Sequence, residues 1–191
     1  CELLAEEPGL SPRARAQLAR MNSACEEMRD LVQTFLMLAR AQRKDMAIVS
    51  QAGLRQIADE LVAQWRGPIE AKGLTLEYEA GQEMLGQFNA PFLRSVMSNL
   101  LRNAMHYTES GSIRLQLGPN GFWVEDTGAG IPEEQRERVF QPFVRGQNPR
   151  GEGLGLGLSL VKRICASEGW DVTLRPDEPH GCRFEVRLAV V

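Results

Sequence analysis

A glycine-rich segment placed directly before a helical pattern constrains this chain more than any other feature. Glycine occupies every second position of a seven-residue stretch: Gly151, Gly153, Gly155 and Gly157. Leucine alternates with the later glycines: Leu154, Leu156 and Leu158. Free N–H groups before a helix N-terminus are suited to binding phosphate, although both GxGxxG and GK[ST] are absent here. A flexible linker is the alternative, but linkers rarely alternate glycine with leucine.

The rest of the chain beyond residue 46 alternates between helical and strand periodicity. Helical spacing of apolar residues covers 54–66, 90–106 and, more briefly, 133–139, and another helix begins near residue 157. Strand patterns cover 47–49, 74–78, 112–117, 121–126, 171–175 and 183–191. We therefore predict an α+β fold, a two-layer α/β sandwich with helices on one face of a mixed, largely antiparallel sheet.

The first 45 residues have a different pattern, that of a helical hairpin fragment. Pro8-Gly9 ends one helix and Ser11-Pro12 begins the next. A heptad seam runs along the second helix: Leu18, Met21, Cys25, Met28, Val32, Phe35 and Ala39. Because two helices cannot close a core alone, a bundle shared between two chains is favoured over packing on this chain's own domain. We predict a hairpin over 1–45 and a second domain over 46–191.

Composition excludes several classes of protein. A net charge of −3 argues against nucleic-acid binding. No apolar run approaches the roughly 18 residues of a membrane span, and the first residues lack the pattern of a secretory signal. The four cysteines show neither a CxxC pair nor a zinc spacing, so we expect reduced thiols in a cytosolic compartment.

Two asparagines on the helix predicted over 90–106 are candidate metal and phosphate ligands. Asn99 and Asn103 are four residues apart, so their amides project from one helix face. An amide oxygen suits a Mg²⁺ ion whose other ligands are phosphate oxygens and waters. The alternatives are two amides on a solvated face or a hydrogen bond from helix to strand.

Asp126 ends a strand pattern and is followed by Gly128 and Gly130. These glycines let the backbone turn sharply and let a flat ligand come close. Asp126 could accept a hydrogen bond from an exocyclic amine, which adenine has and guanine lacks at the same position. The alternative is a turn in which the carboxylate bonds its own backbone.

The segment from Val139 to Arg145 precedes the glycines. Phe140 and Phe143 could hold one end of a lid, and Arg145 could contact a phosphate. A packed helix end is the alternative.

Taken in order, these segments resemble the conserved boxes of sensor histidine kinases. Asn99-Leu-Leu-Arg-Asn103-Ala is similar to the N box and Asp126-Thr-Gly-Ala-Gly130 to the first glycine box. Val139-Phe-Gln-Pro-Phe143 is similar to the F box and Gly153-Leu-Gly-Leu-Gly157 to the second glycine box. The resemblance covers 47–191 as the ATP-binding catalytic domain and, more weakly, 1–45 as part of the dimerisation hairpin.

The resemblance implies that ATP binds with Mg²⁺ between the helical layer and a lid. Asn103 would ligate Mg²⁺, Asn99 would assist at the phosphates, and Asp126 would read the adenine amine. It implies the following further residues at the nucleotide: His106, Tyr107, Gly128, Gly130, Ile131, Phe140, Arg145, Gly153, Leu154, Gly155, Leu156 and Gly157. The γ-phosphoryl would pass to a histidine and then to an aspartate of a response-regulator receiver domain.

The chain departs from the family pattern in its histidines. His106 lies inside the N box and His180 in a late Pro/Gly turn, so neither fits the phosphoryl acceptor. We therefore expect a cytoplasmic fragment of a longer sensor that is anchored in the bacterial inner membrane, is a homodimer through the hairpin and binds ATP without phosphorylating itself. His106 replaces the usual Lys or Arg, so a phosphate contact predicts tighter ATP binding as pH falls through about 6.5; a solvated ring is the alternative.

Related ATPases of the gyrase and chaperone kind are the main competing prediction. They need a glutamate one turn before the Mg²⁺ asparagine to activate water, and anti-sigma serine kinases also carry a glutamate there, but here that position is Asn99. An amide cannot take a proton at neutral pH, so phosphoryl transfer to histidine fits better. A non-catalytic dimer module with a decayed pocket is disfavoured because every box is intact.

Overall fold

The computed structural model describes most of the domain predicted over 46–191. The described residues are 51–81, 84, 86–144, 155–176 and 181–189, together with single positions between 11 and 32. The strand predicted over 47–49 and most of the glycine segment lie outside them. Of the predicted hairpin, the structure describes only single positions, and those from Arg13 to Val32 are helical.

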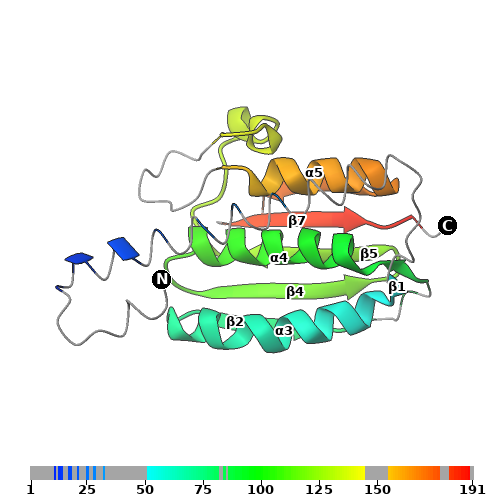
Figure 1. Cartoon of the computed structure of the whole chain (residues 1–191), viewed down its shortest axis with the longest axis horizontal. Coiled ribbons are helices and arrows are strands. Elements are labelled where there is room, and N and C mark those ends of the chain that lie inside the picture. The colour runs from blue at the N-terminus through cyan, green and yellow to red at the C-terminus, as the bar shows by residue number, and fades with distance from the viewer. Residues whose placement is uncertain are drawn as a thin grey trace.

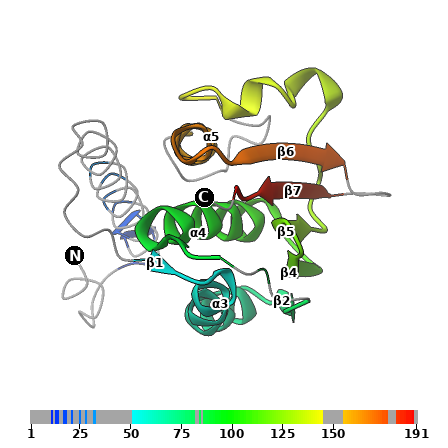
Figure 2. The ribbon, with the colours of Figure 1, turned by 90° about the vertical axis from the view of Figure 1, so that its right-hand side faces the viewer.

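One five-stranded sheet forms the first layer of the domain (Figures 1 and 2). Its strands are β2 (Thr75–Glu79), β4 (Ser112–Gly118), β5 (Gly121–Asp126), β6 (Asp171–Pro176) and β7 (Cys182–Arg187), in the spatial order β2-β4-β5-β7-β6. The β2–β4 pair is parallel and the others are antiparallel. The predicted mixed, largely antiparallel sheet is confirmed.

Three helices form the second layer and cover one face of the sheet, as Figure 2 shows. They are α3 (Leu54–Ala71), α4 (Ala90–Tyr107) and α5 (Gly157–Glu168). The middle helix, α4, packs against both α3 and α5. Its apolar side is almost fully buried, with Phe92, Met97 and Leu100 at 2% exposure or less. The predicted two-layer sandwich is thus confirmed, and α4 lies at its centre.

Strand alternation explains how the sheet separates core from solvent. In β5, Phe122 and Val124 face the helices and are buried. Asp126 is two residues further along the strand, so its side chain lies on the same face and is also buried. The opposite face carries ion pairs that cross neighbouring strands. Glu125 binds two arginines there, Arg114 on β4 at 3.2 Å and Arg183 on β7 at 3.0 Å.

Four local details differ from the sequence prediction. The helix predicted over 133–139 is two separate 3₁₀ turns, η1 (Glu133–Gln135) and η2 (Arg138–Phe140). The helix predicted over 54–66 continues to Ala71 through Pro68, because Ile69 in its last turn is fully buried. The last strand ends at Arg187. A small two-stranded sheet of β1 (Gln51–Ala52) and β3 (Phe88–Asn89) was not predicted, because two-residue strands carry no periodicity.

Among the helices that the structure describes, none combines the length and the apolar character needed to cross a membrane.

Candidate functional site

The two asparagines lie on α4, whose start is fixed by local signals. The Asn89 side chain caps the helix by accepting a hydrogen bond from the Phe92 N–H, and a proline occupies the first turn. Asn99 is buried at 8% exposure, and its Nδ2 donates to the Ser95 carbonyl at 2.8 Å. Asn103 is half-buried, and its Nδ2 is buried with no hydrogen-bond partner. Asn103 therefore has an unused polar group at the site.

The N-terminus of α5 comes close to these two amides. A Cβ atom added to Gly157 would lie 2.9 Å from Asn99 Oδ1 and 3.9 Å from Asn103 Oδ1. The first distance is shorter than ordinary van der Waals contact, so the end of the glycine segment packs against Asn99 only because residue 157 has no side chain. The structure thus brings the start of α5, at the end of the predicted glycine segment, next to the two predicted asparagines.

Asp126 lies at the end of β5 and is only 6% exposed. Its Oδ1 accepts a hydrogen bond from the Gly128 N–H at 2.9 Å, which is the local turn that the sequence left open as an alternative. Gly128 has no room for a side chain, because a Cβ atom there would lie 2.7 Å from the Tyr107 carbonyl oxygen. The turn after β5 therefore packs against the end of α4.

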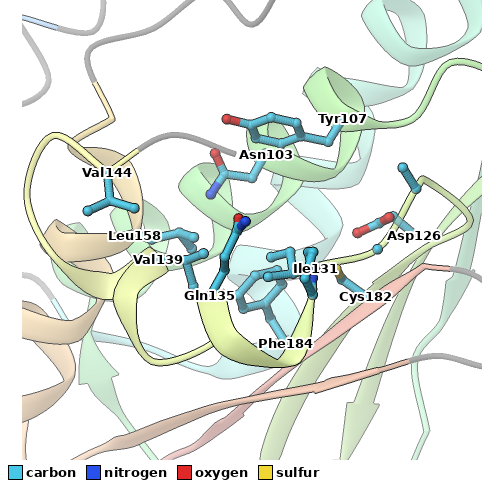
Figure 3. Close-up of a pocket in the computed structure, with 13 residues that line it drawn as sticks. Asn103, Tyr107, Asp126, Ile131, Gln135, Val139, Val144, Leu158, Cys182 and Phe184 are labelled. Carbon is cyan, nitrogen blue, oxygen red and sulfur yellow. The ribbon is translucent and has the colours of Figure 1, made fainter. Parts of the chain in front are cut away.

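A cavity of about 500 Å³ lies between α4, the end of β5, the two 3₁₀ turns and the start of α5 (Figure 3). Its walls are mostly apolar, with a few polar groups: Asn103, Tyr107, Asp126 and Gln135. The other lining residues are Ala129, Gly130, Ile131, Pro132, Val139, Val144, Leu158, Cys182 and Phe184. In Figure 3, Asp126 and Cys182 lie at one end, and Val144 and Leu158 at the other. A mostly apolar cavity with a few polar groups is suited to an aromatic base that carries a polar tail.

Five of the predicted site residues line this cavity: Asn103, Tyr107, Asp126, Gly130 and Ile131. Six others are described but are not part of its lining: Asn99, His106, Gly128, Gly155, Leu156 and Gly157. Arg145, Gly153 and Leu154 lie outside the described residues. Phe140 packs nearby, as described next.

Two predicted residues make packing contacts. The His106 ring meets the Tyr107 ring edge-on, with centroids 4.9 Å apart. The Phe140 ring meets Phe184 edge-on at 6.2 Å, and the Lys162 ammonium lies 5.2 Å from its centroid. Phe140 therefore supports a cavity wall through Phe184, which corresponds to the packed alternative.

Phe143 and Gly155 join the two ends of the chain that flank residues 145–154. The Phe143 N–H donates to the Gly155 carbonyl at 2.9 Å, and both residues have positive φ angles, 64° and 69°. Phe143 is 74% exposed. A Cβ atom at Gly155 would lie 2.8 Å from the Val144 carbonyl oxygen, so glycine is needed at this close approach. The contact holds Val144 and the start of α5 beside the cavity.

The sequence did not predict the part of the wall that β7 supplies. Cys182 lies directly opposite Asp126 in the β5–β7 ladder, and Phe184 lies opposite Val124. The alternation within β7 could have assigned Cys182 and Phe184 to one face. It could not show that β7 pairs with β5, because that pairing joins segments far apart in the sequence. Several other lining residues were also missed: Ala129, Pro132, Gln135, Val139 and Val144.

Among the residues that the structure describes, no group of three or more His, Cys, Asp or Glu side chains could hold a metal ion. The described residues alone therefore offer a metal at this site few ligands. A neutral amide oxygen such as that of Asn103 can supply one ligand to Mg²⁺ when phosphates and waters supply the rest.

The fold is a two-layer α/β sandwich with a cavity beside its middle helix, and comparison with known proteins gives its family. Residues 88–191, more than half of the chain, match the profile of the histidine kinase-, DNA gyrase B- and HSP90-like ATPases. The chain therefore belongs to this ATPase family.

Two similar proteins are named as sensor proteins. The sensor histidine kinase GtrS of Pseudomonas aeruginosa is 34% identical over 137 residues, which cover 71% of this chain and 27% of that protein. The alginate biosynthesis sensor protein KinB of P. aeruginosa is 39% identical over 127 residues, which cover 63% of this chain and 21% of KinB. The chain thus spans about a quarter or less of the length of these relatives.

Solved structures show the same fold. The NMR structure of the histidine kinase domain of the E. coli osmosensor EnvZ is 29% identical with a TM-score of 0.55, covering 75% of this chain and 89% of that one. Full-length ShkA in complex with AMPPNP is 24% identical with a TM-score of 0.66, covering 98% of this chain and 42% of ShkA. The predicted resemblance to the catalytic domain of a sensor histidine kinase is confirmed.

Proposed function

We propose that this chain binds Mg-ATP in the 500 Å³ cavity and serves as the catalytic part of a protein-histidine kinase. The observation that carries the proposal is the pairing of Asp126, nearly buried at one end of an apolar cavity, with Asn103 on its α4 wall. A buried carboxylate can read an exocyclic amine, and apolar walls can enclose a base. Tyr107, Gly130 and Ile131 complete the contacts that we assign to the nucleotide.

Mg²⁺ fits the donor chemistry that Asn103 offers. The Asn103 amide has a buried nitrogen without a hydrogen-bond partner, so the side chain is not committed to a structural bond through that atom. Its oxygen would supply one Mg²⁺ ligand, and Asn99 would assist at the phosphates. When bound, the ion neutralises phosphate charge during transfer of the γ-phosphoryl group.

The chain's own contribution is binding, orientation and exclusion of water. Asp126 would hold the base so that the phosphates point along α4 toward the N-terminus of α5. Backbone N–H groups at Gly155, Leu156 and Gly157 stand at that helix start, where negative charge is favoured. We assign the same role to Gly153, Leu154 and Arg145, which lie outside the described residues. Holding the reacting groups in place is the main source of rate in this chemistry.

The position one turn before Asn103 favours phosphoryl transfer over ATP hydrolysis. The Asn99 side chain is buried and its Nδ2 is bonded to the Ser95 carbonyl. An amide cannot take a proton from water, so the site has no general base at this position. This observation disfavours the gyrase-like and chaperone-like alternatives.

In the longer protein, the γ-phosphoryl would pass to a histidine of the dimerisation helix and then to an aspartate of a response regulator. We also propose that the seam along the helical hairpin joins two copies of the chain. Four seam residues are exposed here, Met21 at 58%, Met28 at 49%, Val32 at 59% and Cys25, as expected for an apolar stripe that needs a second chain. A membrane anchor outside this chain would fit the sensor role.

Titration calorimetry with magnesium adenine and guanine nucleotides tests this proposal. We expect the chain to bind Mg-ATP and to bind Mg-GTP at least about tenfold more weakly, because guanine presents a carbonyl to Asp126. Asp126→Asn keeps the oxygen that accepts from Gly128 but loses the charge, and it should weaken ATP binding. Asp171→Asn, an exposed change at the start of β6, is the matched control.

The magnesium role has its own variant. Asn103→Ala should weaken Mg-ATP binding and should weaken ATP binding in EDTA much less. An absence of heat with every magnesium adenine nucleotide, in a chain shown to be folded, would overturn the proposed function.

A further inference from the structure

A lysine outside the cavity holds the end of the helix that carries the proposed nucleotide ligands. Lys72 directly follows α3, and its Nζ donates hydrogen bonds to three backbone carbonyls at the end of α4. The distances are 2.5 Å to the Met105 oxygen, 3.3 Å to the His106 oxygen and 2.9 Å to the Thr108 oxygen. One side chain thus ties α3 to the last turn of α4 and to the residue that follows it.

Two of these carbonyls, those of Met105 and His106, need such a partner, because the last four carbonyls of a helix have none within the helix. The Ala104 carbonyl is bonded by the Thr108 N–H at 3.1 Å and by its hydroxyl at 2.7 Å. The next two carbonyls are bonded by Lys72. An ammonium group at a helix C-terminus is also favoured by the helix dipole. Burial lowers the pKa of Lys72, and the negative charge of Glu109 opposes that effect.

The turn that Lys72 holds is part of the cavity. Tyr107 lies within the held segment, and its side chain lines the cavity beside Asn103, as Figure 3 shows. The Tyr107 carbonyl also faces the turn after β5, where Gly128 packs without a side chain. A shift of the last turn of α4 would therefore move Tyr107 and loosen the turn that bonds Asp126.

We propose that Lys72 is a positioning residue of the nucleotide site: by holding the last turn of α4, it fixes Tyr107 against the cavity. This inference rests on the proposed function, that is, on ATP binding in the cavity. The sequence alone did not single out Lys72, because it lies 31 positions before Asn103 and outside every motif.

The test compares nucleotide affinity with stability in three variants. Lys72→Met removes the charge and the donors, Lys72→Arg keeps both, and Arg66→Met is the matched control. Arg66 lies in the C-terminal part of α3, near Lys72 in the sequence, but it pairs with Glu70 and donates to the Leu76 carbonyl. We expect Lys72→Met to raise the Kd for Mg-ATP about fivefold. The Kd of Lys72→Arg should stay within about twofold of the wild-type value, and Arg66→Met should leave the Kd unchanged.

A double-mutant cycle shows whether Lys72 acts through Tyr107. If it does, Lys72→Met in a Tyr107→Ala background should change the Kd much less than it does in the wild type. If Lys72→Met does not fold, Lys72→Gln replaces it in the same cycle. Kd values are measured below the urea or thermal transition of each variant, so that only folded protein is compared.

Two results would overturn the inference. A Lys72→Met variant with a lower urea midpoint but an unchanged Kd would show that the lysine only stabilises the fold. Additive effects of the Lys72 and Tyr107 changes would show that it does not act through Tyr107. A wild-type chain that binds no magnesium nucleotide would instead overturn the proposed function, and this inference with it.

Discussion

At the scale of single residues, the site depends on positions where no side chain fits. Gly157, the first residue of α5, is the clearest, because a Cβ atom there would lie 2.9 Å from the Asn99 oxygen. Alanine is favoured over glycine within a helix by about 1 kcal/mol, so the steric and propensity effects of a substitution oppose each other. Function and stability should therefore respond differently.

We predict that Gly157→Ala changes the free energy of unfolding by less than about 1 kcal/mol, because better helix propensity offsets the contact with Asn99. Affinity for Mg-ATP should nevertheless fall, since Asn99 must move. Calorimetry and urea unfolding measure the two effects. Gly53→Ala, at the start of α3 with open space around it, is the control and should leave affinity unchanged. Unchanged affinity in Gly157→Ala would contradict the prediction.

Two of the three cysteines that the structure describes are buried, and they should differ in reactivity. Cys165 on α5 is buried in the core, and desolvation raises the pKa of its thiol to about 12, so it stays neutral and unreactive in the folded protein. Cys182 is also buried but lines the cavity, which gives a reagent a path to it.

We predict that a small alkylating reagent modifies Cys182 but not Cys165 in the native protein, and that Mg-ATP protects Cys182. Peptide mass spectrometry after timed alkylation measures both sites, and urea-unfolded protein is the control in which both should react. Equal protection by Mg-GTP and Mg-ATP, or modification of Cys182 at the same rate with and without nucleotide, would contradict this prediction.

At the scale of elements, ion pairs across the outer face of the sheet connect its strands. Arg114 on β4 bonds Glu77 on β2 at 2.8 Å, and both Arg114 and Arg183 bond Glu125 on β5. The Arg183 guanidinium also lies over the Trp123 ring, 4.4 Å from its centroid. The Glu125 side chain is only 11% exposed, so water weakens its ion pairs less than it weakens ordinary surface pairs.

We predict that Glu125→Gln lowers the free energy of unfolding by about 1–2 kcal/mol, because two arginines lose a partly buried partner. Urea unfolding measures the loss. Glu185→Gln, whose pairs with Arg175 and Arg187 are more exposed, is the control and should cost less than about 1 kcal/mol. Equal losses in the two variants would show that the burial of Glu125 is unimportant.

The sequence predicted those elements whose signal lies within a single segment. For α4, the helical spacing over 90–106 set both ends to within one residue, and the strand patterns over 112–117 and 121–126 set the ends of β4 and β5 equally closely. The stretch 133–139 was predicted as one helix, but it forms two 3₁₀ turns. Apolar spacing over so few residues does not distinguish an α-helix from 3₁₀ turns. Asp126 and Asn103 could be predicted as motif residues, whereas Cys182 and Phe184 depend on strand pairing between distant segments.

At the scale of the whole molecule, one tyrosine couples stability to alkaline pH. Tyr78 on β2 donates its hydroxyl to Asp59 on α3 at 2.6 Å. Burial first, and then this bond, raise the pKa of the phenol well above its usual value. The unfolded chain loses this proton near pH 10, before the folded protein does. The contribution of Tyr78 to the free energy of unfolding is therefore complete below that pH and is lost as pH rises above it.

We predict that the free energy of unfolding falls more steeply between pH 9 and pH 11 in the wild type than in Tyr78→Phe, which has no phenol to titrate. Urea unfolding at several pH values gives the two profiles. At pH 7 the variant should be less stable, because Asp59 loses its donor. Parallel profiles over this pH range would contradict the assignment.

The place of β7 in the sheet has a consequence for how the protein is made. This strand follows all the other strands in the sequence but lies between β5 and β6, and it carries Cys182 and Phe184 into the cavity wall. While a ribosome is still synthesising residues before 182, β5 has one open edge and β6 has no neighbour to pair with. The nascent chain therefore completes the cavity wall only when residues 182–187 have left the exit tunnel, after every other strand of this sheet has been synthesised.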